Sequence, residues 1–269
     1  MRMFRFILLS GVFLGVALIQ AWAGSSASLF DKPLHETHTP LPPDPDNPQT
    51  KPMLSCFYYP DFMVKQVDLG EKGAEQLSIL YRNKDSAEPP CLRANAKDET
   101  VIGPKAWSGY FEGVKGRFVF FTDSDGFNSG LGFVVFDSVE VRMIFEDSVR
   151  FKNFIFTFKV IEEMSDSKND SDSIIKLRYQ KVYDTQCSLR LDEKSCWNRT
   201  KQITGLTEIA PPNCTAAYEA EKKRFPKDAA QIDTFSSVIT YEVEVVLSLR
   251  NSVVRATPIS KALECYLGD

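Results

Sequence analysis

Apolar and polar residues alternate along much of the sequence. In residues 241–249 the odd positions hold Tyr, Val, Val, Leu and Leu, whereas Glu242, Glu244 and Ser248 lie between them. The same period recurs in residues 139–145, 154–160 and 175–183. Because successive side chains of a strand point to opposite faces, a period of two predicts strands with one buried face. A chain made of such strands has to bury those faces in stacked or closed sheets.

Strand patterns extend over most of the chain after residue 53. Residues 131–136 are apolar nearly throughout, which predicts a strand covered on both faces. Weaker patterns occur near residues 62–68, 76–82, 106–114 and 252–259. The sequence thus predicts about ten strands, joined by turns rich in Gly, Asp, Asn and Ser. We expect a mainly β fold, an antiparallel β-sandwich, with a small β-propeller-like meander as the alternative.

One short helix interrupts these patterns near residues 214–225. Pro211, Pro212 and Asn213 stop the preceding segment and offer a cap, and Pro226 ends the run of helix-forming residues. The basic residues at the end of this run are expected to form a solvated helix face.

Residues 1–23 have the pattern of a secretory signal peptide. Arg2 and Arg5 precede an apolar run, and a small-x-small cleavage site follows at residues 21–23. No later stretch is long and apolar enough to predict a membrane span. We therefore expect a soluble protein that is secreted or periplasmic after cleavage.

Residues 24–52 form a proline-rich segment. Seven prolines lie between residues 31 and 52, and large apolar residues are few. Such a composition predicts an extended lead of polyproline II type that does not join a core. Residues 53–269 are then expected to form a single disulfide-bonded β domain.

All six cysteines follow the proline-rich segment. An even number in an exported chain predicts disulfides formed in an oxidising compartment. Spacing favours a Cys187–Cys196 bridge across a short polar turn and a Cys56–Cys91 bridge. The disulfide candidates are Cys56, Cys91, Cys187, Cys196, Cys214 and Cys265.

The distribution of histidine and of charge excludes several functions. His35 and His38 both lie in the proline-rich segment, so residues 53–269 contain no imidazole for a Ser-His-Asp or Cys-His mechanism, or for a zinc or copper site. No cofactor is expected. Without residues 1–23, acidic residues outnumber basic ones by six, and no basic stripe stands out. Nucleic acid is therefore not an expected partner.

Residues 120–138 place Asp123 and Asp125 among glycines and an asparagine, between two apolar runs. The spacing departs from an EF-hand loop, because a glycine is fourth and Val134 is twelfth. The composition predicts a hairpin connection, with a calcium loop of another type or a catalytic carboxylate pair as alternatives. Trp107 and Tyr110 are candidates for stacking on a sugar ring.

Together these patterns favour an exported, non-catalytic binding protein. The expected partner is another protein, a cell-envelope component or a saccharide. The alternative is a secreted, glycosidase-like hydrolase that uses a carboxylate pair.

Overall fold

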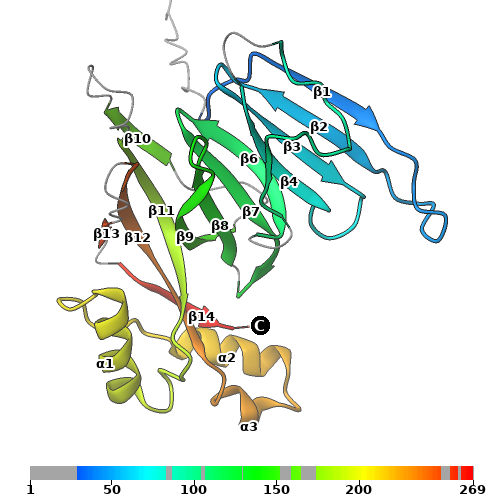
Figure 1. Ribbon diagram of the computed structural model, residues 1–269. Helices are drawn as coiled ribbons and strands as arrows, with labels where there is room; N and C mark the ends of the chain where they lie inside the picture. Colours follow the sequence, from blue (N-terminus) through cyan, green and yellow to red (C-terminus); the bar gives the residue numbers. More distant parts are fainter. Residues whose placement is uncertain are drawn as a thin grey trace, which may run out of the picture.

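The computed structural model describes residues 29–82, 87–103, 107–128, 130–151, 159–164, 174–249, 255–259 and 262–268. In these parts the chain forms fourteen strands and three helices. The strands make two antiparallel sheets, and the helices gather at one end of the molecule (Figure 1). The predicted signal peptide, residues 1–23, lies outside the described residues.

Sheet 1 is an antiparallel meander of five strands in chain order. Each strand pairs with the next one along the sequence. The strands are β1 (His35–Pro40), β2 (Met53–Tyr58), β3 (Phe62–Asp68), β4 (Gln76–Tyr81) and β5 (Glu99–Val101).

Sheet 2 has nine strands, with the central order β13-β12-β11-β9-β8-β7-β6, while β10 pairs with β11 and β14 with β12. Among the described residues, the pairing of β11 with β9 is limited to Lys181 with Val149, and the sheet folds over at this seam. The strands are β6 (Gly109–Lys115), β7 (Phe118–Phe127), β8 (Gly130–Asp137), β9 (Arg142–Arg150), β10 (Lys159–Met164), β11 (Ile174–Asp184), β12 (Ser237–Ser248), β13 (Arg255–Pro258) and β14 (Glu264–Leu267).

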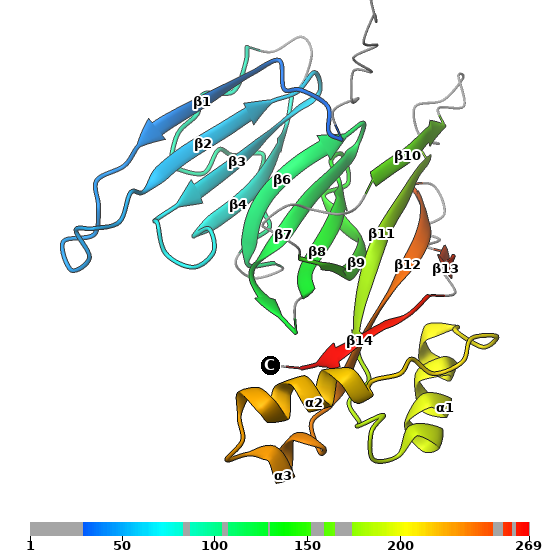
Figure 2. The ribbon, with the colours of Figure 1, turned by 180° about the vertical axis from the view of Figure 1, so that it is seen from behind.

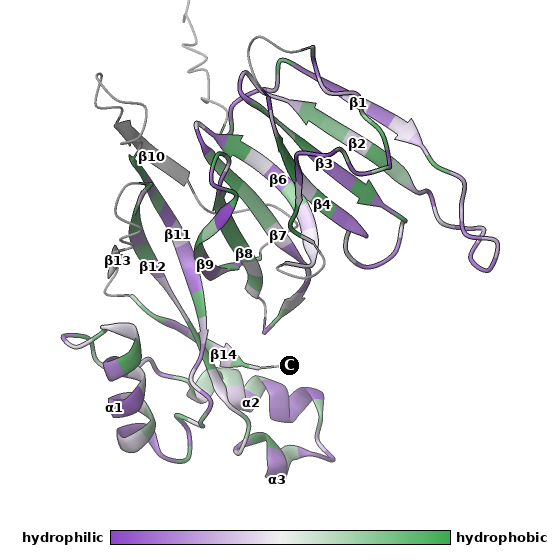
Figure 3. Ribbon diagram, in the orientation of Figure 1, coloured by the Kyte–Doolittle hydropathy of each residue, from purple (hydrophilic) through white to green (hydrophobic). Residues whose placement is uncertain are grey.

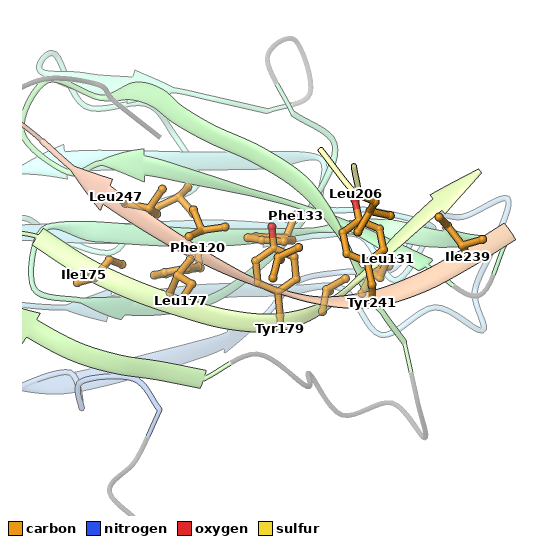
Figure 4. Close-up of a cluster of buried hydrophobic side chains, with 14 of the residues drawn as sticks. Phe120, Leu131, Phe133, Ile175, Leu177, Tyr179, Leu206, Ile239, Tyr241 and Leu247 are labelled. Atoms are coloured by element: carbon orange, nitrogen blue, oxygen red, sulfur yellow. The ribbon is translucent and has the colours of Figure 1, made fainter. Parts of the chain in front are cut away.

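The main core lies between the two halves of sheet 2. Phe120 and Phe133 from β7 and β8 meet Leu177 and Tyr179 of β11 and the apolar face of β12 (Figure 4). Tyr241 belongs to the same cluster. A second cluster fills the space between the other face of β6–β8 and sheet 1. The result is a sandwich of antiparallel layers, as the alternating sequence pattern predicted.

Strand β8 is therefore covered on both faces. Phe133 and Val135 point into the main core, whereas Val134 and Phe136 belong to the cluster facing sheet 1. The central strands β7 and β8 are hydrophobic along much of their length, whereas α1 and α2 mix hydrophilic and hydrophobic residues (Figure 3). The prediction of two-sided burial for residues 131–136 is confirmed, because only such a position tolerates a continuous apolar run.

The helices are α1 (Glu193–Thr204), α2 (Thr215–Arg224) and α3 (Ala229–Ile232). The predicted helix near residues 214–225 is present as α2, but the sequence patterns missed α1. The sequence does contain residues typical of both caps of α1. The Asp192 side chain accepts from the Ser195 N–H, and Gly205 ends the helix at a φ of 75°. Its buried residues are few, so the helical period of apolar positions is weak.

Two of the three disulfides connect other segments to the sheets, and Cys187–Cys196 connects the segment after β11 to α1. The two bridges favoured by spacing, Cys56–Cys91 and Cys187–Cys196, are both present, and Cys214–Cys265 is the third. This content fits formation in an oxidising compartment. Across the described ranges, none of the helices has the length and apolar character that a membrane crossing requires.

Part of the proline-rich segment joins the fold, contrary to the expected separate lead. Residues His35–Pro40 form β1, which pairs with β2 along its whole length (Figure 2). Phe30 lies 5.3 Å from the Phe120 ring, and a Cβ on Gly113 would clash with the Phe30 ring at 2.3 Å. The strand is held by backbone hydrogen bonds rather than by apolar content, and its one proline is at its end, where strands accept proline.

Candidate functional site

The residues singled out in the sequence come together at one end of strands β6 and β7. Tyr110 pairs with Thr122, and Gly109 pairs with Asp123. The indole N–H of Trp107 donates to the Thr122 carbonyl at 3.0 Å. The structure therefore brings Trp107, Tyr110 and Asp123 into one neighbourhood, with Asp125 two residues further along β7.

Both aromatic residues have structural partners at this place. The Tyr110 hydroxyl donates to the Glu71 carbonyl at 3.0 Å and accepts from the Gly73 N–H at 2.9 Å. Trp107 packs against the cluster between the sheets. These contacts attach the β3–β4 connection to sheet 2, so the two rings stabilise a junction and neither is a freely presented sugar platform.

Asp123 and Asp125 lie in a bulge and not in the hairpin turn itself. The β7–β8 hairpin is present as predicted, but β7 continues to Phe127, and the pairing shifts register between Thr122 and Gly126. Asp123 accepts from the Ser124 N–H at 2.7 Å, and Asp125 forms an ion pair with Lys72. The polar residues that we predicted to form the hairpin turn, Asp123 and Asp125, therefore lie in a bulged end of β7.

A small acidic hollow lies beside this bulge, with a volume of about 230 Å³. It is lined by Asp123, Asp125 and Asp184, together with Asn128 and residues of β8, β9 and β11. The Asp184 carboxylate accepts from the Asn128 amide at 3.1 Å and from the Gln186 N–H at 2.7 Å. Throughout the described ranges, no three His, Cys, Asp or Glu residues are arranged to hold a metal ion.

A larger groove, with a volume of about 770 Å³, lies next to this hollow. We call it the helix groove. Helices α2 and α3, the C-terminal strand β14 and the end of β9 enclose it, and Gly268 separates it from Asn128 of the acidic hollow. Its lining consists of Arg150, Ala217, Ala220, Glu221, Arg224, Phe225, Asp228, Gln231, Ile232, Phe235, Tyr266, Leu267 and Gly268.

Buried contacts hold the walls of the helix groove in place. Tyr218 is completely buried, and its hydroxyl donates to the Phe235 carbonyl at 2.8 Å. Lys222 of α2 forms an ion pair with Asp233 at 2.8 Å, just after α3. The Cys214–Cys265 bridge ties the start of α2 to β14. The small side chains of Ala217 and Ala220 leave the space that becomes the groove.

The surface of the helix groove combines apolar and charged groups. Phe225 and Phe235 are 42% and 41% exposed, although aromatic residues of this size are usually more buried. The Arg224 guanidinium lies 4.9 Å from the Phe225 ring centre. Arg150 forms an ion pair with Glu264 and lies 5.8 Å from the Tyr266 ring centre.

Sequence reasoning did not find the helix groove. Residues 222–224 were read as a solvated helix face, and residues 266–268 carried no motif. The available signals were Phe225 and Phe235, two large apolar residues in a polar segment. Their exposure follows from the fold and is not visible in the sequence.

One carboxyl group with an altered pKa lies away from both hollows. Burial raises the pKa of Glu112 to about 7. This residue lies in the bulge of β6 between Phe111 and Gly113. It lines neither the acidic hollow nor the helix groove, so it is a candidate for pH-dependent stability and not for catalysis.

The two histidines lie on sheet 1 and serve to hold β1. His35 stacks on Tyr58 at 4.1 Å, and His38 lies 2.9 Å from the Ser55 hydroxyl. Three positions apart on a strand, they point to opposite faces and do not share a ligand.

Comparison with family models, curated proteins and solved structures gives no significant match, so the function has to be inferred from the chain's own geometry.

Proposed function

We propose that this protein is an exported, soluble, non-catalytic binding protein and that the helix groove receives its ligand. The observation that carries this proposal is the groove itself. Its volume of about 770 Å³ falls within the roughly 300–1,000 Å³ of small-molecule sites. Phe225 and Phe235 expose apolar surface at its lining, and exposed apolar surface in a concave site is typical of ligand or partner binding.

The lining chemistry favours binding over catalysis. Nucleophilic catalysis needs a nucleophile beside a base, and the described residues of the groove's lining include no Ser, Cys, Thr, Lys or His. Its two carboxylates are Glu221, which lies 3.6 Å from Arg224, and Asp228. Glu221 is partly buried and ion-paired, and the neighbouring guanidinium favours its charged form, whereas a general acid has to keep its proton.

Export is supported by two independent features. The pattern of residues 1–23 is that of a cleaved signal peptide. Three disulfides in the described domain fit an oxidising compartment such as the periplasm or the extracellular space. Ligand sources consistent with that location are another protein, a cell-envelope component or a saccharide.

The alternative function is that of a glycosidase-like hydrolase at the acidic hollow. The observation that favours it is the convergence of Asp123, Asp125 and Asp184 on one small space, close to Trp107. Against it, Asp125 is exposed and ion-paired with Lys72. If the hydrolase proposal holds, the protein cleaves chromogenic glycosides, and Asp123→Asn abolishes that cleavage while the Ala220→Trp variant described below retains it.

The binding proposal is tested by filling the helix groove. Ala216 and Ala220 are both exposed on α2, but only Ala220 is among the residues that line the groove. Ala220→Trp therefore places a large ring in the groove, whereas Ala216→Trp places the same ring outside it. Immobilised protein is exposed to native extract or culture fluid, and retained molecules are identified by mass spectrometry. We expect the parent and Ala216→Trp to retain the same ligand and Ala220→Trp to lose it. Equal retention by all three proteins would place the site elsewhere.

A further inference from the structure

The guanidinium groups that line the helix groove are already paired with carboxylates. Arg224 pairs with Glu221 in the same helical turn, and Arg150 pairs with Glu264 of β14. A charged ligand that engaged either guanidinium would have to displace such a partner. The whole chain is acidic, with 36 acidic against 32 basic residues, which further disfavours anions. Charge therefore does not select the ligand of this groove.

The ion pair of Arg224 and Glu221 still offers hydrogen-bonding groups of both kinds. A guanidinium carries several N–H donors, and a carboxylate accepts through two oxygens, so one ion pair uses only part of this capacity. The Arg224 side chain is 73% exposed, and its nitrogen lies 3.6 Å from a Glu221 oxygen. The remaining donors and acceptors suit an uncharged hydroxyl group, which donates and accepts, and the pair stays intact.

Two more polar side chains of the lining belong to the segment of α3. Asp228 precedes this helix, Gln231 lies within it, and both are exposed. Across the described residues, neither side chain has a hydrogen bond or an ion pair, and the Asp228 carboxylate does not cap the helix. A purely apolar ligand would remove both groups from water without replacing their hydrogen bonds, which is unfavourable.

Two exposed phenylalanines flank the same segment and line the groove. Phe225 follows α2, and Phe235 follows α3. The Arg224 guanidinium lies over the Phe225 ring, whereas no ring or cation in the described parts of the chain contacts the Phe235 ring. The face of an aromatic ring is its negative side, so it attracts C–H groups that adjacent oxygen atoms polarise. Such a face beside hydrogen-bonding side chains suits a ligand that has both C–H groups and hydroxyl groups.

From the exposed rings, the paired guanidinium groups and the available polar side chains, we infer that the ligand of the helix groove is a neutral saccharide. Its C–H face lies on the Phe235 ring, and its hydroxyl groups bind Asp228, Gln231 and the pair of Arg224 with Glu221. A cation would gain one ion pair at the exposed Asp228, and such pairs contribute little. This inference rests on the proposed binding function and specifies its ligand class.

An array of immobilised glycans tests the ligand class with the full chain. The array presents neutral glycans beside counterparts of the same linkage that contain a uronic acid or an unacetylated amino sugar. We expect binding to neutral glycans at least about tenfold stronger than to their charged counterparts, a difference of about 1.4 kcal/mol. The absence of binding to any neutral glycan, or a preference for the charged counterparts, would overturn the inference.

The free disaccharide of a bound glycan should compete fully with the array, because the volume of the groove is that of a small-molecule site. Competition by long chains alone would indicate recognition of a polysaccharide surface and would overturn binding within the groove.

A change at Phe235 tests the stacking contact. Phe235→Leu should weaken binding of the best neutral glycan about tenfold, because leucine keeps an apolar side chain but has no ring face. Phe127→Leu is the matched control, since Phe127 is exposed but lies outside the lining of the helix groove. It should change the affinity by no more than about twofold. Equal losses in the two variants would overturn the stacking contact.

The hydrogen bonds and the neutrality of the ligand have separate tests. Asp228→Ala and Gln231→Ala should each weaken glycan binding about fivefold, because each removes one hydrogen-bonding side chain. The affinity of the parent should change by less than about twofold between about 0.05 and 0.5 M salt, because an uncharged ligand forms no ion pair that salt screens. A loss of about tenfold over this range would show that the ligand is charged. Unchanged binding in both alanine variants would overturn the assigned contacts.

The proposed function and the ligand class can fail separately. We expect Ala220→Trp to lose both the bound glycan and the ligand captured from extract, and Ala216→Trp to retain both. If Ala220→Trp loses the captured ligand but no neutral glycan binds to the parent, the groove is a binding site and the saccharide assignment is wrong. If Ala220→Trp retains the captured ligand and the glycan, the proposed function of the groove fails as well.

Discussion

At the scale of single residues, the ion pair of Lys65 in β3 and Glu99 in β5 attaches the β4–β5 connection to sheet 1. We call residues 87–98 of this connection the covering loop. Both side chains are 2% exposed, and the ammonium nitrogen lies 2.7 Å from a Glu99 oxygen. Lys65 also donates to the carbonyls of Leu92 and Ala94, which lie in the loop near Cys91. Burial by itself would raise the pKa of Glu99, but hydrogen bonds from Lys65, Ser78 and the Ala96 N–H hold it below its ordinary value.

Removing one partner of this pair should destabilise the domain strongly. Lys65→Met leaves the Glu99 carboxylate buried without its cation, and we expect a loss of about 3–5 kcal/mol in the free energy of unfolding. The double variant Lys65→Met with Glu99→Leu should recover most of that loss, because neither charge remains buried. Urea unfolding at neutral pH measures both. A single-variant loss below about 1 kcal/mol would show that the pair is hydrated and not buried.

Glu112 should make stability depend on pH in the opposite sense to ordinary carboxylates. Burial raises its pKa from 4.5 to about 7, so the folded state binds a proton that the unfolded state has released between these values. The stability of the folded state that depends on protonated Glu112 is therefore fully present below about pH 4.5 and is lost as the pH rises through about 7. Glu112→Gln should be more stable than the parent by about 1–3 kcal/mol at about pH 8, with a smaller difference at about pH 5. Urea unfolding of the parent and of Glu112→Gln at both pH values tests this prediction. The same difference in unfolding free energy at the two pH values would contradict the raised pKa.

At the scale of elements, the residues before β1 attach sheet 1 to sheet 2. Asp31 forms an ion pair with Lys115 at 2.9 Å and accepts from the Gly116 N–H at 2.6 Å. Its own N–H donates to the Val114 carbonyl of β6. The chain then crosses to β1 at the edge of sheet 1. A segment whose composition indicated an extended lead outside the core is therefore a connection between layers.

Phe30 should be the apolar anchor of that connection. Phe30→Ala removes a ring packed against Phe120 and Gly113, and because Phe30 is partly buried we expect a loss of about 2 kcal/mol. This corresponds to a fall in melting temperature of roughly 4–8 °C for a chain of this size. Leu34→Ala is the control in the same segment, since Leu34 is exposed and should cost less than about 0.5 kcal/mol. Equal effects of the two substitutions in thermal unfolding would mean that Phe30 is not an anchor.

At the scale of the whole molecule, two of the disulfides have different roles: one stabilises sheet 1, and the other fixes the walls of the helix groove. Cys56–Cys91 fastens the covering loop of sheet 1, far along the chain from the groove. Cys214–Cys265 joins α2 to β14, and both of these elements line the groove. The two bridges close chain segments of 35 and 51 residues, so the chain-entropy model assigns each a similar contribution of about 4 kcal/mol.

Removing these two bridges separately should separate stability from binding. Replacing Cys214 and Cys265 by serine should abolish retention of the groove's ligand from extract, because α2 and β14 lose their covalent connection. Replacing Cys56 and Cys91 by serine should lower the melting temperature by a similar amount and leave ligand retention unchanged at a temperature where the variant stays folded. Ligand capture from extract and thermal unfolding of both variants test this. Equal loss of ligand retention in both would show that binding follows global stability.

The alternating sequence indicated the strands at residues 175–183 and 241–249, since a period of two is a local consequence of strand geometry. In the predicted strand 139–145, residues 139–141 form the turn before β9 instead, and residues 154–158 of another predicted strand lie outside the described residues. Residues 131–136 even indicated their two-sided burial, and Cys187 with Cys196 indicated a short-range bridge. The bulge at Asp123 and the strand β1 were not visible, because register and pairing depend on partners distant in the sequence.

The helix groove was decided only by the tertiary structure. Arg150, Ala220 and Leu267 come from β9, α2 and β14, and none of them belongs to a motif. In its own segment Arg224 is a solvated helical residue, as its exposure confirms. It lines the helix groove because the Cys214–Cys265 bridge and the buried Tyr218 place α2 beside β14, next to the seam of sheet 2. Local pattern determines which face of an element is apolar, whereas long-range packing determines which exposed faces come together around an empty space.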